Sequence, residues 1–141
     1  MCGITGIIVF NESGKSFLNK IDASIKTLAQ RGPDANGVYH NNNVALGHTR
    51  LKIIDISDAA SQPFTDSSGR YTIIYNGEFY NYKEHRDALE KSGIKFRSNS
   101  DTEVLLNLFI KEKEKCLEKI NGFFAFAIYD KTEQSLFLAR D

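Results

Sequence analysis

MCGITGIIVF, residues 1–10, is an apolar run that begins almost at the amino terminus of the chain. The run is rich in Ile and Val and gives way to the polar residues 11–14, so Gly3 to Phe10 is predicted to be a buried strand. No basic region precedes the run and no small-residue cleavage site follows it, so it does not fit a secretory signal peptide. Cys2 is therefore predicted to stand at the start of a core strand.

The composition around this strand fits one globular domain of 141 residues, with 41% hydrophobic and 26% charged residues. Eighteen Lys and Arg residues balance eighteen Asp and Glu residues, which argues against nucleic acid as the principal partner. No apolar run is long enough to span a membrane. The two cysteines, Cys2 and Cys116, form neither a disulfide framework nor a CxxC metal motif, which predicts a cytoplasmic protein.

The rest of the first half alternates between helix and strand. Apolar residues recur at spacings of three and four over Ser16 to Gln30, which predicts an amphipathic helix. Two strands, Gly37 to His40 and Val44 to Ile54, are expected around a turn at residues 41–43, and Ser57 to Phe64 is expected to be a loop.

The second half begins with a predicted strand, Tyr71 to Tyr75, that the pair Asn76-Gly77 ends. Helices are predicted after two capping boxes, and two strands follow. The expected features are Asn81 with Glu84, a stop at Gly93, Ser100 with Glu103, and strands over Phe123 to Tyr129 and Gln134 to Ala139. The order lacks the repeated βαβ unit of a parallel sheet, so we expect an α+β domain with mostly antiparallel strands.

Cys2 carries the main chemical prediction. If Met1 is removed, the α-amine of Cys2 has a reference pKa of about 7.7–8.0, close to that of a thiol at about 8.5. The amine can then take the proton of its own thiol, directly or through one water, so nucleophile and base belong to one residue. A Met-Cys start in isolation would more often be a small residue on a buried strand.

Five motifs that follow one another along the chain favour a catalytic Cys2 over a purely structural one. They are Met1-Cys2-Gly3-Ile4, Arg31-Gly32-Pro33-Asp34, Gly47-His48-Thr49-Arg50-Leu51, Tyr75-Asn76-Gly77-Glu78 and Ser100-Asp101-Thr102-Glu103. Together they resemble the glutaminase domain of class II glutamine amidotransferases, which are N-terminal nucleophile (Ntn) hydrolases. The branch they resemble most is the glutamine-hydrolysing asparagine synthase family, since Leu51 stands where sugar-phosphate and phosphoribosyl amidotransferases carry Trp.

The resemblance covers residues 1–141 and implies a four-layer αββα sandwich. It implies that Cys2 attacks the side-chain amide of glutamine and that a γ-glutamyl thioester forms. Asn76, through its side-chain amide, and Gly77, through its backbone N–H, would form the oxyanion hole. Without the other motifs, Asn76-Gly77 would be interpreted as a hairpin turn.

Three further residues would bind the substrate according to the resemblance. Arg50 would grip the α-carboxylate of glutamine, although the residue type alone fits a solvated strand arginine. Glu78 and Asp101 would receive the α-ammonium group, while Asp101 would also favour the amino end of a helix. The Arg31 to Asp34 loop would lie near this site, and Lys52 departs from the small polar residue that the family pattern suggests.

Other candidate residues have structural interpretations. His48 shares a strand face with Arg50, and a hydrogen-bonded structural histidine is preferred over a site-lining one. Cys116 and the aromatic run Phe123 to Phe126 are predicted to be core, and His40 and His85 to be at the surface. No set of Cys, His and carboxylate residues has metal-site spacing.

The resemblance also implies what lies outside the chain. The glutaminase domain itself would need no cofactor, whereas ATP and Mg²⁺ would be used by a synthetase domain that the 141 residues do not contain. The family's glutaminase domain extends past the Leu-Ala-Arg-Asp run at residues 138–141, so an amino-terminal piece of a longer protein is expected. Two alternatives stay open at this point, a sugar or peptide acceptor and an inactive Ntn-type interaction module. A homodimer is also open.

Overall fold

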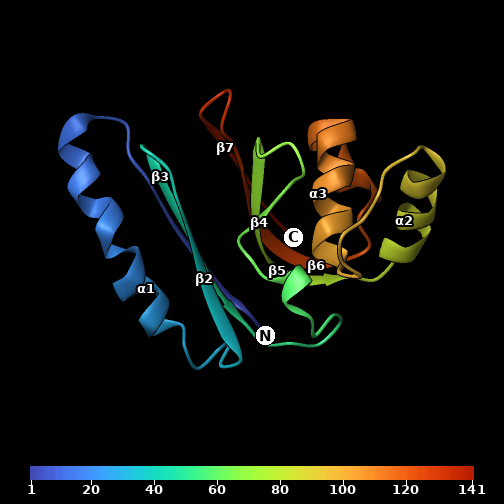
Figure 1. The fold of residues 1–141 in the computed structure, drawn as a ribbon, viewed down its shortest axis with the longest axis horizontal. Helices are drawn as coiled ribbons and strands as arrows, with labels where there is room; N and C mark the ends of the chain where they lie inside the picture. Colours follow the sequence, from blue (N-terminus) through green and yellow to red (C-terminus); the bar gives the residue numbers. More distant parts are fainter.

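Two antiparallel sheets lie face to face between two layers of helices in the computed structural model, which describes residues 1–141 (Figure 1). One sheet has the strand order β1-β3-β2 and the other β4-β5-β6-β7, and every pairing between neighbouring strands is antiparallel. The strands are β1 (Gly3–Ile8), β2 (Ala35–His40), β3 (Val44–Arg50), β4 (Phe64–Thr65), β5 (Tyr71–Phe79), β6 (Gly122–Asp130) and β7 (Ser135–Arg140).

The helices form the two outer layers. The helix α1 (Ile21–Thr27) covers the three-stranded sheet, whereas α2 (Tyr82–Lys91) and α3 (Asp101–Glu112) lie on the far side of the four-stranded sheet (Figure 1). Short 3₁₀ segments complete the chain, namely η1 (Glu12–Lys20), η2 (Asp58–Ala60) and η3 (Lys113–Lys119). The layers confirm the α+β class and the αββα order expected from the sequence. None of the helices is both long and apolar enough to cross a membrane.

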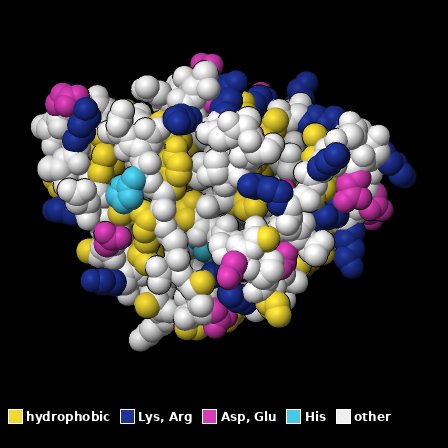
Figure 2. Space-filling model, in the orientation of Figure 1, with side chains coloured by type: hydrophobic (Ala, Val, Ile, Leu, Met, Phe, Trp, Pro, Cys, Tyr) yellow, Lys and Arg dark blue, Asp and Glu magenta, His cyan; other side chains and the backbone are white.

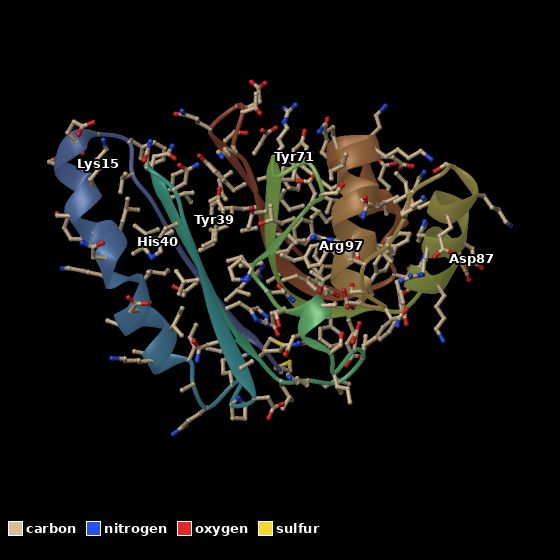
Figure 3. All side chains as sticks on the ribbon, viewed as in Figure 1. Lys15, Tyr39, His40, Tyr71, Asp87 and Arg97 are labelled. Atoms are coloured by element: carbon tan, nitrogen blue, oxygen red, sulfur yellow. The ribbon has the colours of Figure 1, made fainter.

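The central strand β3 is buried along its whole length, because α1 covers one face and the second sheet covers the other. Ala45 packs with Ile25 of α1, whereas Leu46 packs with Ile74 of β5 in the apolar contact between the sheets. Figure 3 shows the same alternation on β2, where Tyr39 and His40 point to opposite faces. The two-residue period of β3 therefore places every second side chain between the sheets.

A larger apolar core fills the space between the four-stranded sheet and its helices. Leu105 and Leu106 of α3 are buried there against Phe79 and Ile73 of β5, and Cys116 belongs to the same cluster as expected. The aromatic run is only partly core, since Phe126 is buried but Phe123 is 36% exposed. On the outside, Lys and Arg side chains lie beside Asp and Glu side chains (Figure 2).

Two strands are shorter than predicted because their partners end. The strand β1 stops at Ile8, which pairs with Val44, the first residue of β3, and β1 is half-buried because it is an edge strand. At its other end β3 stops at Arg50, which pairs with Ala35, the first residue of β2, so residues 51–54 have no strand beside them. The predicted helix over residues 16–30 begins earlier, because the Asn11 side chain caps its start by accepting a hydrogen bond from Gly14 N (2.9 Å). Its first part, Glu12–Lys20, is a 3₁₀ helix.

The prediction that Asn76-Gly77 ends a strand is wrong. Strand β5 continues to Phe79, and Asn76 and Gly77 pair with Ala125 and Phe124 of β6. A Cβ atom at Gly77 would lie 2.3 Å from the Phe123 carbonyl oxygen, so this close pairing requires a glycine. Nine paired residues outweigh the local preference of Asn-Gly for a turn.

One predicted capping box forms in part and the other does not. Ser100 Oγ accepts from Glu103 N (3.3 Å), but the Glu103 carboxylate binds the backbone N–H groups of Arg97 and Ser98 instead of returning to Ser100. The Asn81 side chain makes no cap, because it binds Lys119 O and Asn121 N across the loop that leads to β6. Helix α2 still ends before Gly93, whose φ is +94°.

The packing of α3 predicts a large effect of Leu106→Ala. This side chain is fully buried, and its loss is expected to reduce the free energy of unfolding by about 2–5 kcal/mol through lost apolar contact and a residual cavity. Leu138→Ala, at a side chain that is 69% exposed, is the matched control and should change stability by about 0.5 kcal/mol or less. Urea unfolding measures both, and equal losses would contradict this packing.

Candidate active site

A hollow at one end of the contact between the two sheets collects most of the chemically notable residues. The residues that line it include all six that the sequence analysis assigned to catalysis or substrate binding: Cys2, Arg50, Asn76, Gly77, Glu78 and Asp101. They come from the residue before β1, the last residue of β3, the second half of β5 and the first turn of α3. Four separate elements therefore converge at one place.

The thiol of Cys2 faces the residue that follows β3. The distance from Leu51 N to Cys2 Sγ is 3.4 Å, so this backbone N–H donates to the sulfur, and Cys2 is half-buried. The Cys2 carbonyl oxygen accepts from Arg31 Nε (3.0 Å). The pairing of Gly3 with Thr49 fixes the backbone between them. Cys2 Sγ also lies 3.7 Å from the Leu51 carbonyl oxygen, so the sulfur contacts both polar groups of the Leu51 backbone.

Arg50 is a buried cation that forms no ion pair with a carboxylate. Its guanidinium donates to the carbonyl oxygens of Asp55 and Ser57, the latter at 2.9 Å. Neither Arg50 nor Glu78 takes part in any of the ion pairs of the chain, although both line the hollow. A charge held by neutral carbonyls keeps its attraction for an incoming carboxylate.

Asp101 is the first residue of α3 and is buried at the floor of the site. Its Oδ2 accepts from the Tyr75 hydroxyl (3.2 Å) and from Phe79 N (3.3 Å). Burial raises the pKa of Asp101, against the opposing effect of these donors. Burial and the neighbouring Asp101 charge also raise the pKa of Tyr75, so its hydroxyl stays protonated and donates. A bound cation would favour the charged form of Asp101.

His48 differs from its prediction. It is fully buried on β3, but neither ring nitrogen has a hydrogen-bond partner, and it does not line the hollow. Burial lowers its pKa from 6.5 to about 4; the nearby Tyr75 backbone opposes this shift, and the charge on Arg50 acts in the same direction as burial. The expected hydrogen-bonded histidine is therefore wrong in its bonding, and His48 is neutral at pH 7.

The loop at residues 31–34 lies beside the site, as the resemblance implied. Besides the bond from Arg31 to Cys2, the Asp34 carboxylate accepts from Lys52 N (2.9 Å), and Lys52 Nζ lies 3.4 Å from Asp58. The unusual Lys52 side chain therefore pairs with Asp58 of η2. No group of three or more His, Cys, Asp or Glu side chains is placed to hold a metal ion.

Several residues that line the hollow were not predicted from the sequence. Tyr75 and Thr102 adjoin assigned residues directly in the sequence, and that adjacency was the available signal. Gln62 carried no chemical signal of its own. Phe123 also lines the hollow, although the aromatic run that contains it was predicted to be core.

The burial of His48 predicts a pH dependence of stability. The unfolded chain takes up this proton near pH 6.5 and the folded chain only near pH 4, so the stabilising contribution is complete above pH 6.5. It is expected to decrease by roughly 3 kcal/mol as the pH falls from 6.5 to 4. When the free energy of unfolding in urea is plotted against pH over this range, the plot should be less steep for His48→Leu than for the unchanged chain. The exposed His40, as His40→Gln, is the control. An unchanged slope in His48→Leu would contradict the prediction.

Comparison with known proteins gives a consistent family. The model of the glutamine amidotransferase domain matches residues 1–141. Asparagine synthetase [glutamine-hydrolyzing] 3 of Bacillus subtilis (strain 168) is 43% identical over 143 residues, which cover 100% of this chain and 23% of that protein. Asparagine synthetase B [glutamine-hydrolyzing] of Escherichia coli (strain K12) is 32% identical over 141 residues, with 100% of this chain and 25% of that protein covered.

A solved structure agrees with the fold. The glutamine phosphoribosylpyrophosphate amidotransferase from B. subtilis, complexed with ADP and GMP, superposes with a TM-score of 0.58 and 26% sequence identity over 70% of this chain and 23% of that chain. The chain thus spans about a quarter of the length of these relatives. Since the family model covers every residue, the chain belongs to the glutamine amidotransferase domain family.

Proposed function

We propose that this chain hydrolyses glutamine to glutamate and ammonia, and that the ammonia feeds ATP-dependent asparagine synthesis in a longer parent protein. The observation that carries the proposal is the composition of one hollow. A thiol, amide donors, a guanidinium without an ion pair and three carboxylates, those of Asp55, Glu78 and Asp101, line it together. Glutamine at neutral pH carries a carboxylate, an ammonium group and a side-chain amide, and each has a partner of suitable chemistry here.

The reaction begins at the amino terminus of the mature protein. After removal of Met1, the α-amine of Cys2 takes the thiol proton and the sulfur attacks the side-chain amide carbon of glutamine. The Asn76 side-chain amide and the Gly77 N–H stabilise the oxyanion, each contributing about 3–4 kcal/mol of the barrier reduction. The amine returns its proton to the leaving nitrogen, so ammonia departs and a thioester remains. Water hydrolyses the thioester to glutamate and restores the thiol.

Substrate binding uses the charges of the hollow. Arg50 presents a planar fork to the α-carboxylate, while Glu78 and Asp101 receive the α-ammonium group. The backbone carbonyl oxygens that hold Arg50 are neutral, so its guanidinium can still pair with the carboxylate of a substrate. Binding a zwitterion would therefore compensate a buried cation and a buried carboxylate together, which favours glutamine over amides without both charges.

The parent protein supplies the rest of the proposed activity. We infer that residues 1–141 form the amino-terminal part of the glutaminase domain, and that a synthetase domain elsewhere in the parent protein uses ATP and Mg²⁺. The glutaminase steps themselves use only this chain's residues and water. The coverage of the asparagine synthetases, at 22% to 30% of each relative, supports additional domains, and a cytoplasmic location fits such an enzyme. The 43% identity to an asparagine synthetase, against 26% to the phosphoribosylpyrophosphate amidotransferase, supports asparagine synthesis over transfer to phosphoribosyl pyrophosphate.

The proposal predicts selective labelling of one cysteine. The electrophilic glutamine analogue 6-diazo-5-oxo-norleucine should modify Cys2 and leave Cys116 unmodified, because Cys116 is fully buried and burial raises its pKa to about 11. Intact mass should also show the loss of one methionine, and peptide mass spectrometry locates the label. The Cys2→Ala variant should take up no label. Retention of Met1, or labelling of Cys116 in a folded sample, would contradict the catalytic role of Cys2.

Two substitutions should separate binding from turnover. Arg50→Ala is expected to raise the KM for glutamine by about 10- to 100-fold, the value of charge-assisted hydrogen bonds to a carboxylate. Asn76→Ala is expected to lower kcat by about 100- to 1,000-fold, because it removes an oxyanion donor. Steady-state glutaminase assays measure both. The exposed Arg140, as Arg140→Ala, is the control for loss of positive charge. Equal changes of KM and kcat in both variants would contradict the separate roles.

A further inference from the structure

The side chain of Gln62 is buried, and both ends of its amide group are hydrogen-bonded. Its Oε1 accepts from Tyr75 N (2.6 Å) and its Nε2 donates to Thr102 Oγ1 (3.2 Å). A backbone N–H can only donate, so the Tyr75 contact fixes which end of the amide carries the oxygen. The single side chain thus bridges strand β5 and the first turn of helix α3.

The short strand β4 explains why this bridge exists. It pairs with β5 only through Phe64 with Ile73 and Thr65 with Thr72. Extending the same register would bring the Gln62 backbone carbonyl opposite the Tyr75 N–H, but this carbonyl lies beside Gly37 of β2 instead. The Tyr75 N–H would remain buried without a partner, and an unsatisfied buried donor costs about 1–3 kcal/mol. The Gln62 side-chain oxygen accepts from it instead.

The two ends of the bridge adjoin the two halves of the site. Tyr75 directly precedes Asn76 and Gly77, the proposed oxyanion hole, whereas Thr102 directly follows Asp101, the proposed ammonium acceptor. The Tyr75 hydroxyl spans the same gap through its 3.2 Å bond to Asp101 Oδ2. Resting on the proposed function, we infer that Gln62 is a positioning residue that sets the distance between the oxyanion hole and the ammonium-binding carboxylate.

Variants of Gln62 itself and of its partner Thr102 test this role in the full-length protein. Gln62→Met keeps the length of the side chain but removes both hydrogen bonds, so kcat for glutamine hydrolysis should fall and KM should rise, each by about 3- to 10-fold. Thr102→Val releases only the α3 end, so KM should rise by a similar factor while kcat stays within about twofold. Thr102→Ser keeps the hydroxyl and should restore KM.

A matched control separates positioning from stability. Thr72→Val also removes a buried hydroxyl, one that bonds Thr65 Oγ1 at 2.9 Å, but Thr72 does not line the hollow. It should lower the free energy of unfolding in urea without changing kcat or KM. If Gln62→Met does not fold, the comparison of Thr102→Val, Thr102→Ser and Thr72→Val still distinguishes a positioning role from a purely stabilising one.

The outcomes distinguish this inference from the proposed function. An unchanged protein that hydrolyses glutamine, together with variants whose kcat and KM match it or follow only their stability, overturns the positioning role alone. A kcat loss in Thr102→Val larger than its KM effect also overturns it. An unchanged protein that neither hydrolyses glutamine nor takes up the analogue at Cys2 overturns the proposed function itself. A KM that rises in Thr102→Val, but stays at the value of the unchanged protein in Thr102→Ser and Thr72→Val, supports the inference.

Discussion

The burial of β3 on both of its faces is the constraint on which the site depends. Its period of two sends Leu46 into the apolar contact with the second sheet, and the same period brings Arg50 to the hollow. A shift by one residue would turn Leu46 toward α1 and remove Arg50 from the hollow, so the apolar contact fixes the register of the charged residue. The pairing of Gly3 with Thr49 then places Cys2 beside Leu51. One ladder therefore positions both Cys2, the proposed nucleophile, and Arg50, the proposed carboxylate-binding residue.

Arg50 and Asp101, the buried charged residues of the hollow, are held by neutral hydrogen-bond partners. Arg50 donates to backbone carbonyl oxygens, and Asp101 accepts from a hydroxyl and a backbone N–H. Such partners reduce the desolvation cost of a buried charge but do not compensate the charge itself. The hollow thus holds the positive charge of Arg50 and the negative charge of Asp101 without an ion pair between them, which suits a ligand that carries both a carboxylate and an ammonium group. His48 adds no positive charge at neutral pH, because burial lowers its pKa to about 4.

The sequence predicted the elements whose signals are local and failed where distant residues decide. The helix after Ser100 begins where its cap lies, since the serine and the N–H it accepts from are three residues apart. The Asn81 side chain, by contrast, is taken by Lys119 and Asn121, which are 38 and 40 residues away. Pairing with β6 likewise draws Asn76-Gly77 into a strand, and no pattern near residue 76 contains that information. Tertiary partners thus override the capping and turn preferences of asparagine.

The candidate site shows the same division between local signals and distant contacts. The six assigned residues belong to short motifs, and the structure brings all of them to one hollow. The residues that join those motifs were not found, because their contacts cross 13 and 40 positions of sequence, as between Gln62 and its partners Tyr75 and Thr102. A motif identifies groups with suitable chemistry but does not fix the distance between them. In this chain that distance follows from buried hydrogen bonds, and a buried amide with both ends bonded can be recognised only once the fold is known.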